Sequence, residues 1–204
     1  MTGAVVVGLV VAGLAWAALF APARAGFWER ATVAGLVIGT YGVVAQRGHL
    51  GRLLRPTVLD VAIGAAGAVA LYGVFWAGDR MLHLVVPDVA RQIGELYTVR
   101  ASAGRWMPLV LMIVGPCEEL FWRGFVQDRA GVAVALVGYA AVHLWERKVA
   151  LILAAVVGGA AWSALFAWRG SLIAPIVCHA LWDLAVVVWF PFRPPDHAEP
   201  AVDA

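Results

Sequence analysis

The stretch VGPCEELFWRGF, residues 114–125, places Glu118, Glu119 and Arg123 inside a segment that otherwise has the composition of an apolar helix. Charged side chains in a hydrophobic interior are costly unless they are paired or hydrated, and they commonly mark functional sites. Three charges so close together therefore indicate a buried polar site. The composition of the rest of the sequence indicates the class of protein to which this site belongs.

The composition of the chain is that of a membrane protein. Of its 204 residues, 63% are hydrophobic and 14% are charged, whereas soluble domains average about half and about a quarter. Seven apolar runs, bounded by charged residues, glycine or proline, are candidates to cross a hydrocarbon layer about 30 Å thick. They cover residues 3–22, 30–46, 57–77, 105–123, 130–145, 149–168 and 171–192.

These runs predict an all-α fold, a polytopic transmembrane bundle of about six to eight membrane helices in a lipid bilayer. We expect a single membrane domain over residues 1–192, with its motif core at 105–192, and a disordered polar tail over 193–204. The first run has no basic residues before it, so we interpret it as a retained span and not as a signal peptide. The net charge of +2 comes from scattered arginines, a pattern that gives no support for a nucleic-acid partner.

The connection between the third and fourth runs predicts an amphipathic helix. Its apolar residues recur at helical spacing, whereas Arg91 and Glu95 lie off that stripe. Such a helix suits either the membrane interface or the side of the bundle, and the sequence leaves both open. The stripe comprises Leu82, Val85, Val86, Val89, Ile93, Leu96 and Tyr97.

Most of the ionisable residues within the apolar runs fall into spaced pairs. Glu119 and Arg123 are four residues apart, with the acid before the base, and this spacing forms an ion pair on one helical face. Glu118 lies about 100° further round the helix, so its carboxylate is left for another contact. His179 and Asp183 have the same four-residue spacing, which presents two groups to one metal ion or one water molecule.

A third predicted helix contributes His143, one turn after Tyr139, while Asp60 stands apart near the start of an earlier run. Taken singly, a histidine or an ion pair in an apolar run is commonly a packing feature. Here, however, ionisable residues lie on three separate predicted helices, concentrated in the last four runs. Their burial costs free energy, so packing alone is a poor explanation for them. The pattern therefore predicts one shared site.

The motif order EExxxR (118–123), YxxxH (139–143) and HxxxD (179–183) resembles the CPBP family of intramembrane proteases, which comprises CAAX proteases and bacteriocin-processing (Abi) proteins. Together the motifs cover residues 118–183. The second motif of the family usually begins with phenylalanine, and Tyr139 in that place is expected to pack as an aromatic. The resemblance implies an all-α bundle whose buried cavity holds a water molecule poised for peptide hydrolysis.

The resemblance also implies a role for each motif residue. Glu118 would be the general base that activates the water, and His143 would help to hold that water or a metal ion. The two residues of HxxxD would be metal ligands or would stabilise the tetrahedral oxyanion. Glu119 and Arg123 would fix their helix and orient the base.

Two chemistries for water activation stay open at this point. A divalent metal would lower the pKa of the bound water and polarise the scissile carbonyl, and a set of two carboxylates and two imidazoles suits zinc (Zn2+). The alternative is a glutamate that acts without a metal. The zinc ligands of the first chemistry would be Glu118, His143, His179 and Asp183.

The predicted function is that of an intramembrane endopeptidase that cleaves a membrane-associated peptide or membrane protein. The short chain, rich in alanine, glycine and valine, suggests a prokaryotic cell (inner) membrane. One alternative is a non-catalytic scaffold or immunity protein of the same fold. It is disfavoured because every motif position is filled, whereas a relative that has lost its activity is expected to lack one. Another is a proton-coupled transporter, although no inverted repeat of the kind that many transporters have is evident.

Overall fold

The computed structural model of the chain describes residues 2–20 and 26–192, except for the side chains of 98–103. Within these ranges every regular element is a helix, which confirms the all-α prediction. The predicted polar tail, 193–204, lies outside the described residues.

Each of the seven predicted apolar runs overlaps a helix, and some helices extend beyond their run. The α-helices are α1 (Gly3–Phe20), α2 (Phe27–Gln46), α3 (Leu50–Leu53), α4 (Val58–Val85), α5 (Pro87–Arg100), α6 (Met107–Phe121), α7 (Asp128–Ala130), α8 (Val132–Val142), α9 (Val149–Arg169) and α10 (Ile173–Asp183). Two short 3-10 helices, η1 (Ala101–Trp106) and η3 (His143–Glu146), and two π-helices, η2 (Trp122–Gln127) and η4 (Leu184–Trp189), extend them.

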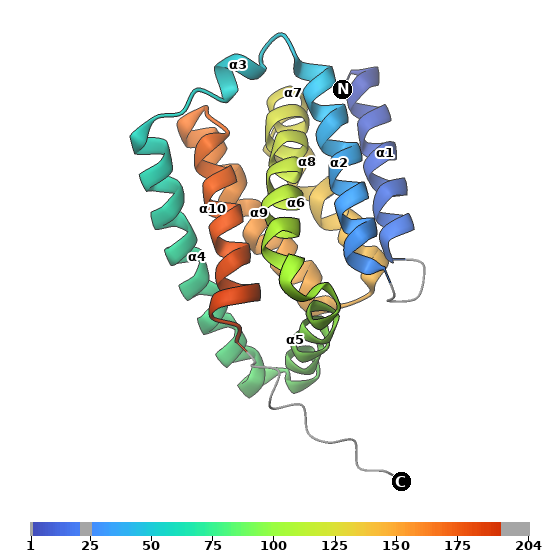
Figure 1. Ribbon diagram of the computed structural model, residues 1–204, viewed down its shortest axis with the longest axis vertical. Coiled ribbons are helices and arrows are strands. Elements are labelled where there is room, and N and C mark those ends of the chain that lie inside the picture. Colours follow the sequence, from blue (N-terminus) through green and yellow to red (C-terminus); the bar gives the residue numbers. More distant parts are fainter. Residues whose placement is uncertain (1, 21–25, 193–204) are drawn as a thin grey trace.

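Three helices of the described part of the chain, α1, α4 and α9, are long and apolar enough to cross a membrane. The helices pack side by side, with α4 and α10 at one edge of the bundle and α1 and α2 at the other (Figure 1). Between these edges, α6 packs against both α2 and α10, and α8 packs against α9. The two motif helices α6 and α10 are therefore neighbours.

The connection before α6 differs in part from its prediction. The expected amphipathic helix is divided, because α4 continues to Val85 and α5 begins at Pro87. Proline has no N–H to donate and disfavours helical geometry in the residue before it, and Val86 has φ −139° and ψ 72°. The polar positions Arg91 and Glu95 of α5 are exposed as predicted, while its apolar side chains turn toward the bundle.

Close helix crossings depend on glycines that admit a neighbouring backbone. A Cβ atom on Gly64 of α4 would lie 2.6 Å from the carbonyl oxygen of Ala174 in α10. In the same way, a Cβ atom on Gly39 of α2 would lie 2.8 Å from Cys117 in α6. Small residues commonly allow such close approach between membrane helices.

The crossing of α4 and α10 gives a first prediction. Gly64→Ala forces the two backbones apart, and overpacking of this kind costs roughly 1–3 kcal/mol. We expect a lower thermal unfolding midpoint in detergent, measured by circular dichroism. The control is Gly73→Ala on the same helix, where an added Cβ would meet no atom within 4 Å. An equal midpoint for the two variants would contradict the packing at this crossing.

Candidate active site

The fully buried pair of Glu119 and Arg123 lies in the core next to the site. Nη1 of Arg123 donates to Oε1 of Glu119 at 2.9 Å, which confirms the predicted ion pair. The other guanidinium nitrogen, Nη2, donates to the carbonyl oxygen of Gly159 in α9 at 3.1 Å. The guanidinium also lies over the rings of Tyr139 and Trp162, at 4.8 and 5.3 Å from their centres. Arg123 therefore joins α6 to α8 and α9.

His179 is held from three sides. Its Nδ1 lies 2.8 Å from Oε1 of Glu119. The indole ring of Trp162 stacks on the imidazole, with ring centres 3.6 Å apart and an interplanar angle of 16°. Its Nε2 lies 3.7 Å from Oδ2 of Asp183, the predicted partner one turn along α10. Because a carboxylate paired with arginine only accepts hydrogen bonds, Nδ1 carries a proton and Nε2 is left for the cavity.

A glycine of α6 lets α10 approach. A Cβ atom on Gly115 would lie 3.3 Å from Oδ2 of Asp183 and 3.6 Å from the ring of His179. The next residue, Pro116, does not interrupt α6, which continues through this position to Phe121. The glycine, more than the proline, thus brings the HxxxD pair next to the EExxxR helix.

Glu118 faces away from the ion pair. Its Oε2 accepts a hydrogen bond of 2.8 Å from the hydroxyl of Tyr139. The backbone carbonyl of Tyr139 in turn accepts a hydrogen bond of 2.7 Å from Nδ1 of His143, which begins the 3-10 turn η3. Since a carbonyl oxygen only accepts, Nδ1 of His143 is protonated and its Nε2 has a free lone pair.

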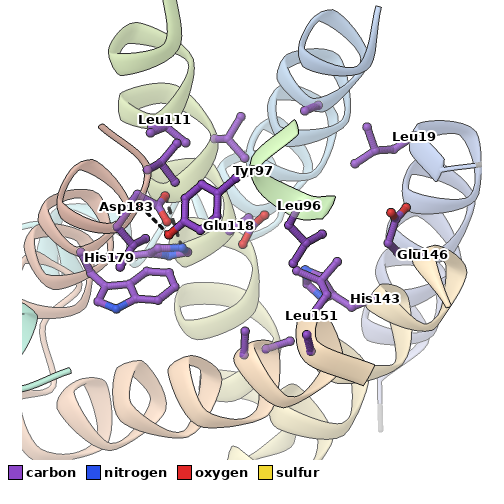
Figure 2. A pocket seen from close by; sticks show the side chains of 18 of the residues that line it. Leu19, Leu96, Tyr97, Leu111, Glu118, His143, Glu146, Leu151, His179 and Asp183 are labelled. Atoms are coloured by element: carbon purple, nitrogen blue, oxygen red, sulfur yellow. Dashed lines mark hydrogen bonds and ion pairs between the residues drawn. The ribbon is translucent and has the colours of Figure 1, made fainter. Parts of the chain in front are cut away.

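One cavity of about 530 Å³ is lined by Glu118, His143, His179 and Asp183. Figure 2 shows Glu118 between the His179–Asp183 pair on one side and His143 on the other. The structure thus brings four of the predicted site residues to one space from three helices. Its walls are largely apolar and aromatic, with contributions from Trp16, Phe75, Leu96, Leu111, Trp162 and Trp182.

The other ionisable residues named in the sequence analysis lie behind or outside the cavity. Glu119 and Arg123 do not line it but support it from within the core. Asp60 lies elsewhere: its Oδ1 accepts a hydrogen bond from Nε of Arg169 at 2.7 Å, and its Oδ2 one from the hydroxyl of Thr57. This acid serves to join the start of α4 to the end of α9.

The described side chains do not fit a metal ion in their present geometry. Among the described residues, no group of three or more histidine, cysteine, aspartate or glutamate side chains is arranged to hold one. The hydrogen bonds of the two histidines do not decide the question, because only Nδ1 is engaged, in His179 with Glu119 and in His143 with a backbone carbonyl. The zinc set of Glu118, His143, His179 and Asp183 stays a prediction.

Two contributors to the site were not assigned to it from the sequence. Tyr139 packs as expected but also hydrogen-bonds Glu118. Trp162 stacks on His179, yet it is one of 10 tryptophans and belongs to no motif. The sequence carries no signal that distinguishes Trp162 from the other nine, because the stacking depends on how α9 crosses α10.

These features define the class of the protein: a helical bundle with membrane-type helices around a cavity whose lining includes the motif carboxylates of Glu118 and Asp183 and the imidazoles of His143 and His179. Residues 101–185 match the family described as Rce1-like, Type II CAAX prenyl endopeptidase Rce1-like. This segment is therefore similar to a CAAX protease family, which confirms the predicted resemblance, and the match includes all three motifs. No curated protein and no solved structure is significantly similar to the chain.

Proposed function

We propose that this protein is an intramembrane endopeptidase that hydrolyses a peptide bond in a membrane-associated peptide or membrane protein. The observation that carries the proposal is the convergence of Glu118, His143, His179 and Asp183 on one cavity. This convergence lies within a domain matched to a protease family, 101–185. Glu118, His143 and His179 are buried there, and a site shielded from water strengthens electrostatic contacts with a reacting group.

In the proposed reaction, Glu118 accepts a proton from a water molecule that also donates to Nε2 of His143. The water oxygen attacks the scissile carbonyl carbon, and the carbonyl oxygen becomes negative. Nε2 of His179, when protonated, donates to this oxyanion, with Asp183 beside it. Glu118 then returns its proton to the departing amine, so the C–N bond breaks and the site is regenerated.

The membrane setting belongs to the same proposal. We infer that the bundle crosses a cell membrane with six to eight helices, of which α1, α4 and α9 have the required length and composition. Helix α5 lies at one end of the bundle (Figure 1), and we propose that its exposed polar side faces the membrane interface. A peptide substrate would then reach the cavity from the lipid phase.

The test uses purified protein in liposomes together with a library of membrane-anchored peptides. Defined cleavage products, identified by mass spectrometry, would support the endopeptidase. Stoichiometric binding of a peptide without cleavage would favour the scaffold or immunity protein. Proton-coupled uptake without cleavage would favour the transporter, so each alternative has its own result.

Metal analysis tests the zinc prediction. If Glu118, His143, His179 and Asp183 are zinc ligands, the purified wild type should contain about one equivalent of zinc, since imidazole and carboxylate ligands suit this metal. His143→Ala and His179→Ala should each lose it. The control is His49→Ala, outside the cavity, which should retain the metal. Zinc retained in both cavity variants would refute the ligand assignment.

A further inference from the structure

Tyr139 is buried at the point where the cavity meets the core. It is 4% exposed, and its hydroxyl donates to Oε2 of Glu118 at 2.8 Å. Glu118 itself is 6% exposed, so few other donors can reach this oxygen. A hydrogen bond to a buried carboxylate is stronger than one between neutral groups. The orientation of the carboxylate therefore depends on where this hydroxyl is held.

The ring of Tyr139 is fixed on several sides. Trp122 and Trp162 contact it edge to face, with ring centres 5.6 and 6.2 Å away. The guanidinium of Arg123 lies 4.8 Å from its centre. A Cβ atom on Gly159 would lie only 3.0 Å from Cδ1 of Tyr139, so α9 presses closely on the ring. These contacts hold the hydroxyl in one place.

We propose that Tyr139 is a positioning residue for the general base, an inference that rests on the proposed function. Its hydroxyl occupies one oxygen of Glu118 and leaves the other, Oε1, to accept the proton of the attacking water. The same tyrosine orients His143 through its backbone carbonyl. Tyr139 thereby orients both Glu118 and His143, the two groups proposed to hold the water. The carboxylate of Glu118 then does not have to be reoriented during the reaction.

Tyr139→Phe tests the hydroxyl alone, because the ring and the backbone carbonyl are retained. We expect kcat to fall roughly 10- to 100-fold, the loss that follows when one hydrogen bond to a charged group is removed. KM should stay near its wild-type value, because the contact affects the reacting geometry and not substrate binding. A residue that only packed would leave kcat per folded molecule unchanged.

Tyr41→Phe is the matched control. The hydroxyl of Tyr41 also donates over a short distance, 2.7 Å to the carbonyl oxygen of Ala4, but Tyr41 does not line the cavity. This variant should retain wild-type kcat. Thermal unfolding midpoints are measured for both variants, and the assays are run below the lower one.

The outcomes separate this inference from the proposed function. Wild-type kcat for Tyr139→Phe beside an inactive Glu118→Gln would overturn the inference and leave the endopeptidase intact. An active Glu118→Gln would overturn the proposed function itself. A Tyr139→Phe protein that no longer folds would show that the hydroxyl serves the fold, and this too would overturn the positioning role.

Discussion

Glu118→Gln is expected to fold like the wild type and to lose peptidase activity by a factor of roughly 10²–10⁴, the usual contribution of a general base. The amide has the shape of the carboxylate, and its oxygen can still accept the hydroxyl of Tyr139. It cannot take a proton from water. The loss should therefore appear in kcat, while KM stays close to the wild-type value.

The matched control for Glu118 is Glu146→Gln. Glu146 is a glutamate of the same cavity but belongs to none of the three motifs, and Figure 2 shows it beyond His143. The control should keep most of the activity, because its carboxylate is distant from the proposed water. Unfolding midpoints of both variants should match the wild type. Activity retained by Glu118→Gln would remove the general base from the mechanism.

Arg123→Met is expected to be the most destabilising substitution at the site. It leaves the carboxylate of Glu119, which is 0% exposed, without its counter-ion. Removal of one partner from a buried ion pair costs about 3–5 kcal/mol. The variant also loses the hydrogen bond to Gly159 and the contacts with Tyr139 and Trp162. Chemical denaturation in detergent micelles should show the loss as a lower midpoint.

A double variant distinguishes the effect of the unpaired charge from the effect of the lost packing contacts. Glu119→Gln combined with Arg123→Met removes the unpaired charge and should recover much of the lost stability, since neutral replacements of buried ion pairs are well tolerated. Arg91→Met is the control, because Arg91 pairs with Asp88 where both side chains are largely exposed. It should leave the midpoint unchanged. Equal midpoints for Arg123→Met and Arg91→Met would contradict a structural role for the buried pair.

The parts of the site that lie on one helix could be predicted from the sequence. Two residues four apart share a helical face wherever the helix is placed, so Glu119 and Arg123 form their ion pair as predicted. The spacing of His179 and Asp183 likewise brings Nε2 and Oδ2 to 3.7 Å. These contacts need only the helical period. The apolar runs predict the helices for the same local reason.

Contacts between helices could not be predicted in this way. Glu119 and His179 are 60 residues apart, and Glu118 and Tyr139 are 21 apart. Both contacts depend on how α6, α8 and α10 rotate and cross, and a glycine at 115 sets one of these crossings. No periodicity in a single sequence encodes such rotations. The resemblance named the residues, but it did not show that Tyr139 donates to Glu118.

The oxygen Oε1 of Glu119 accepts from both Arg123 and His179. One atom therefore ties the anchoring of the bundle to the tilt of an imidazole in the cavity. Position 119 is therefore a poor target for protein engineering. Any substitution there would alter both the stability of the bundle and the orientation of His179. Libraries that leave Glu119 unchanged and vary the exposed surface are expected to raise stability without altering the cavity.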